Sequence, residues 1–389
     1  MKNLNKKLLL SSPTMHKEEM EYINEAFEKN WVAPLGFNCD GFENEMEKYL
    51  GWGSAFAMVS GTSALHMSFI LAGIKKDDIV FCSDLTFAAS ANSISYVGAK
   101  QVFIDSEKDS WNMDPDALEE GFKKYPNAKA VVLVDLYGTP GKIEKIVEIC
   151  KKHNAILIED AAEALGSHIN NKKCGTFGDY CVLSFNGNKI ITTSGGGMII
   201  CKDKESRDRA LFLSTQAREK APWYEHNEIG YNYRMSNVVA GIGRGQLLHL
   251  EEHIARKKEI YFRYKEGLKD LPIKMNPYLE GTEPNYWLSC LTVNKEAMCK
   301  QVRTSTATSW TKEDGKSCPD LIASHLLENN IETRPIWKPM HMQPVYKNND
   351  FISKGVDEDI FERGICLPSD IKMTNEEQDF VIEKIKECF

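Results

Sequence analysis

Short apolar runs alternate with longer amphipathic segments from about residue 56 to residue 201. The apolar runs predict buried strands, and the amphipathic segments between them predict helices. The predicted strands are 56–60, 79–82, 101–104, 130–134, 155–160, 181–185 and 198–201, and the predicted helices are 63–71, 88–97, 143–152 and one that begins at Asp114 and Pro115. Strands that alternate with helices are typical of a mainly parallel sheet with helices on both faces. The fold class is therefore α/β, and functional groups are expected at the carboxyl ends of the strands.

The pattern changes after about residue 250. A long charged helix is predicted over 247–271, followed by a strand over 287–293, a helix over 319–330 and a final helix capped by Thr374 and Glu377. Residues 300–317 are polar and lack periodicity, which predicts an exposed loop. Because 389 residues exceed what one hydrophobic core usually organises, we expect two domains. These are a large α/β domain of residues 1–250, whose first 50 residues are helical and polar, and a small α+β domain of residues 251–389.

The chain is acidic, with 48 Lys and Arg residues against 56 Asp and Glu residues and a formal net charge of −8. Without a long basic block it lacks the electrostatic footprint of a protein that binds nucleic acid or anionic lipid. No apolar run approaches the roughly 18 residues of a membrane helix, and the first ten residues lack the features of a signal peptide. The 11 cysteines have no C-x-x-C spacing, and the nine histidines have no metal-ligand spacing. We therefore expect free buried thiols, no metal site and a cytoplasmic protein.

Asp160 ends the predicted strand 155–160, where a carboxylate has two common uses. It can cap the helix that follows, or it can pair with a cationic ring nitrogen, as the carboxylate partner of pyridoxal 5′-phosphate (PLP) does. Its position alone favours neither use. Lys189 lies between two predicted strands, flanked by apolar residues and followed by glycines at 195, 196 and 197. A lysine in such a place is expected to be desolvated and nucleophilic, and the glycines allow positive φ and close approach of a ligand.

The turn Ser60-Gly-Thr-Ser-Ala64 joins a predicted strand to a predicted helix. N–H groups and hydroxyls at a helix N-terminus suit a phosphate group, although simple capping explains this turn equally well. Phe87 begins the next predicted helix and is placed to stack on a flat ring, with core packing as the default. Three glycines before a strand do not form the G-x-G-x-x-G motif of dinucleotide-binding enzymes. The order along the chain, a phosphate-like turn, an aromatic residue, Asp160 and then Lys189, is that of the fold type I PLP enzymes.

Motifs over nearly the whole length resemble the DegT/DnrJ/EryC1/StrS aminotransferases, which act on nucleotide-linked sugars. The matching segments are Gly36 with Phe42-Glu, Ser60-Gly-Thr-Ser-Ala-Leu, Thr86-Phe, Asp135-Leu-Tyr-Gly, Glu159-Asp-Ala-Ala, Ser184-Phe-x-x-x-Lys, Gly230-Tyr-Asn-Tyr-Arg-Met-Ser and Arg363-Gly-Ile-Cys-Leu-Pro. The resemblance implies a PLP-dependent aminotransferase of fold type I that works as a homodimer with shared active sites. Within the family, Glu163 stands where many members have His or Gln. In this respect the chain is similar to the branch that serves the UDP-N-acetylbacillosamine pathway.

The resemblance assigns roles position by position. Lys189 resembles the lysine that holds PLP as a Schiff base and moves protons, and Asp160 resembles the partner of the ring nitrogen. Phe87 resembles the aromatic residue that stacks on the ring, and Glu163 the residue near the ring hydroxyl. The residues that match phosphate contacts are Thr62, Ser63 and Ser184, with Asn232 reaching the phosphate from a second subunit. The residues that lie in the stretch lining the sugar-nucleotide site are Arg334, His341 and Tyr346.

The implied reaction moves an amino group from L-glutamate to a nucleotide-linked 4-keto-6-deoxy sugar, with UDP-2-acetamido-2,6-dideoxy-hexos-4-ulose as the expected substrate. The product is a 4-amino-4,6-dideoxy sugar nucleotide for polysaccharide or glycan synthesis. The nucleotide (UDP, GDP or dTDP) and the aminated carbon (C3 or C4) stay open. The alternatives are a 3-aminotransferase on a dTDP-linked keto-sugar, a PLP-dependent sugar dehydratase of the same fold, a non-catalytic paralogue that binds a sugar nucleotide, and a dinucleotide-dependent sugar enzyme, which the missing glycine motif disfavours. Lys189 counts against the dehydratase, which usually has His at this position, and Lys189 together with Asp160 counts against the paralogue.

Overall fold

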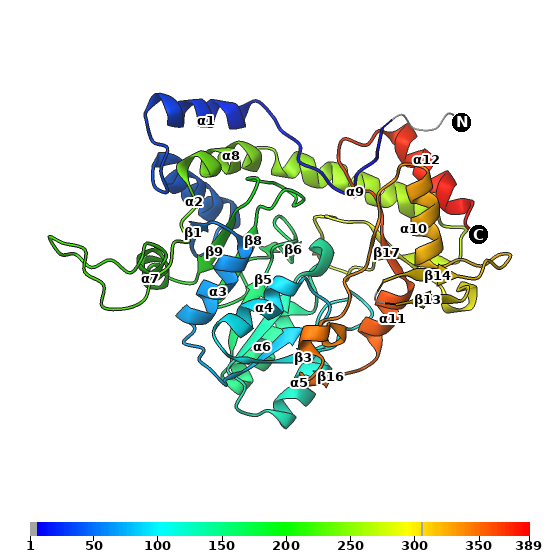
Figure 1. The fold of residues 1–389 in the computed structure, drawn as a ribbon, viewed down its shortest axis with the longest axis horizontal. Helices are drawn as coiled ribbons and strands as arrows, with labels where there is room; N and C mark the ends of the chain where they lie inside the picture. Colours follow the sequence, from blue (N-terminus) through cyan, green and yellow to red (C-terminus); the bar gives the residue numbers. More distant parts are fainter. Residues whose placement is uncertain (1–5, 305) are drawn as a thin grey trace.

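An eight-stranded sheet forms the centre of the structure, a computed structural model that describes residues 6–304 and 306–389 (Figure 1). The strand order is β1-β9-β8-β5-β4-β2-β3-β16. The strands are β1 (Ser54–Met58), β2 (Ile79–Ser83), β3 (Lys100–Ile104), β4 (Ala130–Val134), β5 (Ile156–Asp160), β8 (Tyr180–Ser184), β9 (Gly197–Cys201) and β16 (Phe351–Ile352). Only β9 runs antiparallel to its neighbours β1 and β8. The mainly parallel sheet predicted from the sequence is confirmed.

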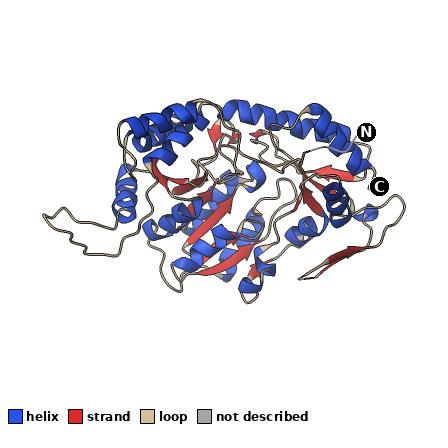
Figure 2. Ribbon diagram, turned by 45° about the horizontal axis from the view of Figure 1, so that its top comes forward, coloured by secondary structure: helices blue, strands red, loops and turns tan. Residues whose placement is uncertain are grey.

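Helices cover both faces of this sheet, as Figure 2 shows. Successive residues of a strand point to opposite faces, so Val80 and Phe81 of β2 belong to two different buried clusters. One cluster includes α2, α5, α6 and α8, and the other includes α3, α4 and α7. The helices are α1 (Glu18–Glu28), α2 (Phe37–Leu50), α3 (Gly61–Leu71), α4 (Ala88–Tyr96), α5 (Pro115–Lys124), α6 (Ile143–His153), α7 (Lys204–Ser214) and α8 (Asn237–Leu247). Asp114 caps α5 and Pro115 occupies its first turn, as predicted.

The C-terminal part has its own antiparallel sheet in the order β10-β12-β17-β15. Its strands are β10 (Ile273–Met275), β12 (Cys290–Val293), β15 (Arg334–Pro335) and β17 (Gly364–Cys366), and its helices are α9 (Leu250–Gly267), α10 (Pro319–Glu328), α11 (Val356–Arg363) and α12 (Asn375–Lys386). The capping box of Thr374 and Glu377 at the start of α12 is present as predicted. Several segments link this part to the rest of the chain: Leu8 forms a bridge with Ile331, and β16 adds to the edge of the large sheet.

One expectation for the C-terminal part was wrong. Residues 300–317 contain a hairpin of β13 (Gln301–Arg303) and β14 (Thr308–Trp310), where an exposed loop was expected. The residues of the hairpin are largely solvent-accessible on both faces, so the apolar alternation that marks a half-buried strand is missing. The charged helix predicted over 247–271 is present as α9, which is shorter than predicted and begins at Leu250 and ends at Gly267. A third small sheet has the order β11-β6-β7, with β6 (His168–Ile169), β7 (Lys172–Lys173) and β11 (Thr282–Glu283).

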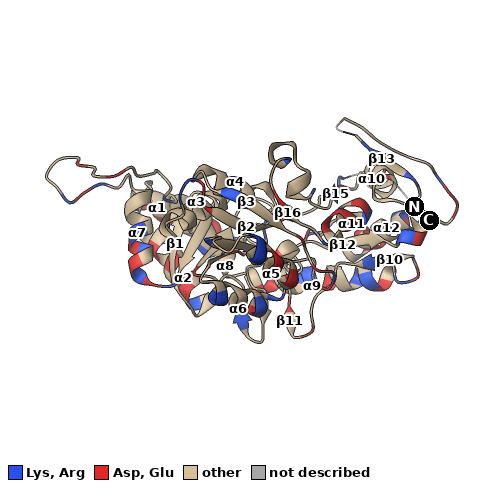
Figure 3. Ribbon diagram, turned by 90° about the horizontal axis from the view of Figure 1, so that it is seen from below, with Lys and Arg blue, Asp and Glu red and all other residues tan. Residues whose placement is uncertain are grey.

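Charged residues of both signs are interspersed over the outer helices, for example on α6 and α7 (Figure 3). Residues 215–236, between α7 and α8, form a long arm whose tip extends away from the sheet (Figure 1), while its base returns to β1, where the Met235 N–H donates to the Ala57 carbonyl. Among the residues described, none of the helices has the length and apolar character that crossing a bilayer requires.

Candidate active site

A cavity of about 340 Å³ opens at the carboxyl ends of β1, β4, β5 and β8. This volume falls within the range of small-molecule sites. It is lined by six residues that the sequence singled out, Thr62, Phe87, Asp160, Glu163, Ser184 and Lys189. The lining also includes Ser60, Thr86, Asn186, Asn188, Trp287 and Trp337. The cavity therefore gathers at one edge of the sheet residues that are up to 277 positions apart in the chain.

The turn between β1 and α3 supplies the anion-binding end of the cavity. Ser60 caps α3 by accepting the backbone N–H of Ser63 at 3.0 Å, and the Ser63 hydroxyl is 3.1 Å from the Ser60 N–H. This capping box leaves the first N–H groups of α3 available at a helix N-terminus, which favours negative charge. Gly61 keeps the turn close to β8, since a Cβ there would lie 3.1 Å from Ser184 Cβ. Capping and phosphate binding, alternatives in the sequence, are thus compatible.

Asp160 ends β5 and is buried beneath the cavity. Its Oδ2 accepts the Ser90 hydroxyl at 2.8 Å, and its Oδ1 accepts the N–H of Ala162 at 3.2 Å. Burial raises the pKa of Asp160, while the hydrogen bonds from Ser90 and Ala162 and the charge of Lys189 act in the opposite direction. A carboxylate held in this way is suited to bind a protonated ring nitrogen.

Lys189 enters the cavity from the loop between β8 and β9. Its Nζ lies 3.5 Å from Glu163 Oε1 and 4.2 Å from the centroid of the Trp287 ring, and its side chain is 12% exposed. Burial raises the pKa of Glu163 above its ordinary value, although the charge of Lys189 and the hydrogen bond from the Tyr137 N–H act in the opposite direction. The carboxylate and the aromatic face together hold the amine in a place where it is largely shielded from water.

The glycine run after Lys189 has a role in close packing. The positive φ value in this loop belongs to Ser194, at 74°, and not to the three glycines. A Cβ on Gly197 would lie 2.3 Å from the backbone nitrogen of Gly61, so only glycine lets β9 reach the turn before α3. Of the two reasons that the sequence offered for these glycines, close approach is the one that the structure supports.

Aromatic residues form the walls of the cavity. Phe87 is 54% exposed, and its ring centroid lies 5.3 Å from that of Trp337. The N–H of Trp337 donates to the Tyr137 hydroxyl at 2.9 Å, and the indole N–H of Trp287 donates to the carbonyl of Asn188 at 2.7 Å. Sequence reasoning missed Trp287 and Trp337, because a tryptophan far along the chain gives no sign of which cavity it will reach.

Five other candidates lie outside the lining of this cavity. Ser63 is buried and engaged in the capping box, and Asn232 is exposed on the arm of residues 215–236. Arg334 is exposed and pairs with Glu332, whereas His341 pairs with Asp84. The buried Tyr346 hydrogen-bonds to Asn92. The roles implied for these five residues remain predictions.

A buried group next to Asp160 contains Asp135, Glu159 and Cys174, whose ligand atoms lie within 4.8 Å of one another. The Glu159 carboxylate accepts N–H groups of the 175–178 loop, including that of Phe177 at 2.7 Å, and so holds this loop against β5. Burial, together with the neighbouring charge of Glu159, raises the pKa of Asp135 well above its ordinary value. The raised pKa favours the neutral form of Asp135 beside the Glu159 carboxylate.

The chemistry of the cavity is that of a PLP site. A helix N-terminus faces the place of an anion, a buried carboxylate suits a ring nitrogen, an amine is available to bond an aldehyde, and aromatic walls enclose the space. The Thr86 hydroxyl is 2.9 Å from that of Ser90, which in turn bonds Asp160, so the polar groups at this end support one another.

Comparisons with known proteins give the same family as the sequence motifs. A family model described as the DegT/DnrJ/EryC1/StrS aminotransferase family matches residues 13–386. EpsN of Bacillus subtilis (strain 168), whose description names a pyridoxal phosphate-dependent aminotransferase, is 43% identical over 395 residues that cover 99% of this chain and 97% of EpsN. GDP-perosamine synthase of Escherichia coli O157:H7 is 36% identical over 377 residues, 97% of each chain.

A more distant relative and a solved structure complete the comparison. The UDP-4-amino-4,6-dideoxy-N-acetyl-beta-L-altrosamine transaminase of Campylobacter jejuni is 34% identical over 283 residues, which cover 71% of this chain and 74% of that protein. The crystal structure of aminotransferase TlmJ from Streptoalloteichus hindustanus matches with a TM-score of 0.87 at 27% identity, covering 98% of both chains.

Proposed function

This chain belongs to the DegT/DnrJ/EryC1/StrS family and is a PLP-dependent sugar aminotransferase, and we propose that it transfers the amino group of L-glutamate to a UDP-linked 4-keto-6-deoxy sugar. The expected substrate is UDP-2-acetamido-2,6-dideoxy-hexos-4-ulose, and the product is the corresponding 4-amino sugar nucleotide. The observation that carries the proposal is the convergence of Lys189, Asp160 and the N-terminus of α3 in one cavity.

In this proposal each polar group holds one part of PLP. The N–H groups and hydroxyl at Gly61 and Thr62, together with Ser184, would hold the phosphate, and Asp160 would pair with the ring nitrogen. Phe87 would cover the ring, and the Lys189 amine would hold the cofactor through its aldehyde group. When bound, PLP supplies an electron-poor ring that stabilises negative charge on the carbon next to the amine.

The protein's own work is to position groups and move protons. Lys189 brings an amine into this cavity and would serve as the general base and acid that moves a proton between the amino donor and the bound cofactor. Asp160 would keep the ring nitrogen protonated, and the Ser90 hydroxyl keeps Asp160 oriented. The walls formed by Phe87, Trp287 and Trp337 limit water in the cavity.

The choice of sugar nucleotide rests on two supports. Motifs such as Glu159-Asp-Ala-Ala-Glu resemble the branch that serves UDP-N-acetylbacillosamine synthesis. A relative that covers 71% of the chain carries a UDP-linked 4-amino sugar in its name. The GDP-linked sugar in the name of the E. coli relative makes a GDP-4-keto-sugar the main competitor.

A homodimer with shared active sites is part of the proposal. The arm of residues 215–236 extends from the body and exposes Trp223 at 63%, Tyr224 at 77% and Ile229 at 85%. Large apolar side chains exposed together favour contact with another protein surface. Asn232 lies on the same arm and is exposed, as a residue that reaches a neighbouring subunit would be. In a mixture of inactive Lys189→Ala and Asn232→Ala proteins, exchange of subunits should restore one intact site per dimer and part of the activity.

The experiment that tests the proposal follows the absorbance of the lysine-bound cofactor. L-glutamate should bleach this absorbance, and the UDP-linked 4-keto sugar should restore it. GDP- and dTDP-linked keto-sugars are tested in parallel, and NMR of the product identifies the aminated carbon. Lys189→Ala should abolish turnover, while Lys202→Ala, at an exposed lysine paired with Asp179, serves as the matched control. Wild-type turnover by Lys189→Ala would refute the assignment, and recovery only with a dTDP-linked 3-keto sugar would replace the substrate.

A further inference from the structure

Residues 337–346 form a short segment that lies against the carboxyl end of β2, and the two meet at Asp84. The N–H of Met340 donates to the carbonyl oxygen of Asp84 at 2.9 Å, and the N–H of His341 donates to Asp84 Oδ1 at 2.8 Å. His341 Nδ1 lies 2.6 Å from Asp84 Oδ2. Asp84 is fully buried and cannot bond water. The two adjacent residues Met340 and His341 therefore supply most of the hydrogen bonds that its oxygens accept.

The rest of the His341 ring contacts residues of β16 and α11. Nε2 lies 3.3 Å from Glu358 Oε1, and the Phe351 ring stacks on the imidazole with centroids 3.9 Å apart and planes 8° from parallel. Both ring nitrogens and one ring face are therefore engaged within the protein. His341 is also not among the residues that line the cofactor cavity.

Acidic groups from three elements surround this histidine: Asp84 after β2, Asp105 after β3, and Asp357 with Glu358 on α11. Burial lowers the pKa of His341, but the hydrogen bond and charge of Asp84, with the charges of Glu358 and Asp105, raise it above its ordinary value. Burial, together with the charges of Asp84 and Asp105, raises the pKa of Asp357 well above its ordinary value and so favours its neutral form. The positive charge of His341 then balances the negative charge of Asp84.

The contact at Asp84 is connected to the cavity on both sides. Thr86 and Phe87, which line the cavity, follow Asp84 by two and three residues. Trp337, which forms the opposite wall, precedes His341 by four residues and lies 5.3 Å from Phe87, centroid to centroid. The His341–Asp84 contact thus joins the segment that carries Phe87 to the segment that carries Trp337.

We propose that His341 is a positioning residue that acts through Asp84: it fastens residues 337–346 to the end of β2 and so holds Trp337 against Phe87 above the cofactor cavity. The inference rests on the proposed function only in taking this cavity as the place where cofactor and sugar meet. It differs from the role implied by family resemblance, in which His341 touches the sugar nucleotide. Loss of the contact should loosen one wall of the cavity and leave the cofactor end, built from β1, β5 and β8, intact.

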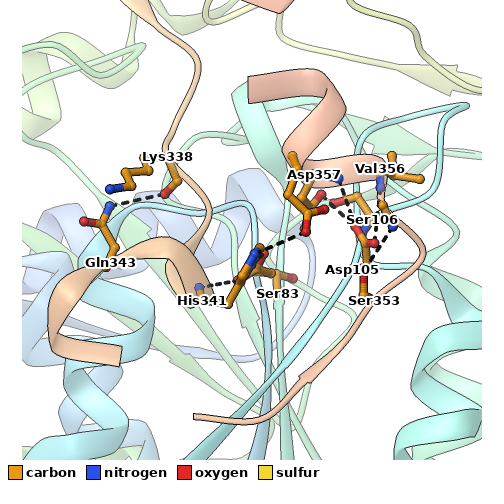
Figure 4. Close-up of polar contacts among 12 residues, drawn as sticks. Ser83, Asp105, Ser106, Lys338, His341, Gln343, Ser353, Val356 and Asp357 are labelled. Carbon is orange, nitrogen blue, oxygen red and sulfur yellow. Dashed lines mark hydrogen bonds and ion pairs between the residues drawn. The ribbon is translucent and has the colours of Figure 1, made fainter. Parts of the chain in front are cut away.

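Amide hydrogen exchange of the holoenzyme tests the fastening without any substrate. The exchange of residues 337–346 should rise by about 10- to 100-fold in His341→Ala, because a hydrogen-bonded pair with a buried carboxylate is lost. Asp84→Asn should give a similar rise, and the double variant should add little, since both changes remove the same contact. Gln343→Ala is the matched control, because the Gln343 side-chain amide donates to the Lys338 carbonyl at 3.3 Å, within the same segment and away from Asp84 (Figure 4). It should leave the exchange unchanged.

Two conservative variants distinguish the contributions of the two nitrogen atoms of the His341 ring. An asparagine amide nitrogen can take the place of Nδ1, which faces Asp84, and a glutamine amide nitrogen can take the place of Nε2. His341→Asn should therefore restore slow exchange more fully than His341→Gln. The reverse order, or unchanged exchange in His341→Ala, would overturn the proposal. These variants also keep the test decisive where Asp84→Asn fails to fold.

A kinetic measurement then distinguishes positioning from general destabilisation. In His341→Ala and Asp84→Asn the rate at which L-glutamate bleaches the cofactor should stay within about 2-fold of wild type, whereas KM for the keto-sugar nucleotide should rise about 10-fold in both. A fall in the rate of bleaching equal to the loss with the sugar would contradict the inference. If wild type accepts none of the sugars tested, the proposed substrate fails, but the hydrogen-exchange result still decides the role of His341.

Discussion

Lys257 offers a quantitative test of how the cavity is supported from behind. Its Nζ is fully buried, and it donates to the Trp287 carbonyl at 3.0 Å and to the Ser11 hydroxyl at 3.1 Å. Burial lowers the pKa of Lys257 from 10.5 to about 7, although the charge of Asp370 acts in the opposite direction. The Trp287 ring in turn contacts Lys189, whose Nζ lies 4.2 Å from the ring centroid. The protonation of Lys257 is therefore linked both to folding and to one wall of the site.

The direction in which stability changes with pH follows from proton binding. Between pH 7 and 10.5 the unfolded chain holds a proton on Lys257 that the folded protein does not, so stability rises with pH over this interval. At about 1.4 kcal/mol per pKa unit, the full cost of burying the charged form below pH 7 is on the order of 5 kcal/mol. Lys257→Met removes this cost together with two hydrogen bonds. The free energy of unfolding of wild type minus that of the variant should therefore increase by about 2 kcal/mol from pH 7 to pH 9.

Urea unfolding followed by tryptophan fluorescence measures this difference. Protein and cofactor concentrations are kept equal, since both ligand and subunit binding shift apparent stability. Taking the difference between two proteins cancels the titration of groups that both retain, such as the buried cysteines. Lys258→Met is the control, because Lys258 is exposed and pairs with Glu283 at 3.3 Å. A Lys257→Met difference that stays constant from pH 7 to pH 9 would show that Lys257 remains charged in the folded protein, and the reasoning would be refuted.

Three further predictions concern the cofactor end of the cavity. Asp160→Asn should slow the L-glutamate half-reaction by roughly 100-fold or more, measured as the rate of bleaching, because the charge that holds the ring proton is lost. Ser90→Ala should slow the same step by only about 10-fold, since Asp160 keeps its charge and loses one hydrogen bond of 2.8 Å; an effect as large as that of Asp160→Asn would contradict this order. Gly197→Ala should lose bound cofactor, as measured by the absorbance ratio, because its Cβ would lie 2.3 Å from the Gly61 nitrogen, whereas Gly187→Ala, which lies outside the cavity lining and whose Cβ would meet Ser194 O only at 4.0 Å, should retain the cofactor.

The cofactor end could be predicted from local sequence patterns. Asp160 and Ser184 lie at the ends of strands, Thr62 lies at a strand-to-helix turn, and Lys189 lies in a loop beside glycines. In a parallel sheet such positions meet at one edge whatever the details of packing. This is why all four line the same cavity, although each motif alone had a simpler explanation.

Long-range contacts could not be predicted in the same way. Trp287 and Trp337 reach the cavity from the C-terminal part, more than 95 residues beyond Lys189. His341 and Tyr346 follow Trp337 closely in the chain, yet their side chains contact Asp84 and Asn92. Which of several aromatic and polar side chains on one segment faces the cavity depends on the contacts of its neighbours, and the sequence carries no periodic signal for that in short 3₁₀ turns.

The two ends of the cavity thus depend on different physical constraints. The cofactor end is fixed by buried strands and helix α3, where a change in backbone position disturbs the whole sheet. The walls are carried by connecting segments, each fixed by a few long-range hydrogen bonds, such as those from Lys257 to Trp287 and from His341 to Asp84. Connecting segments tolerate change more readily than the elements they join. Selectivity for the sugar nucleotide should therefore follow the segments around Trp287 and Trp337.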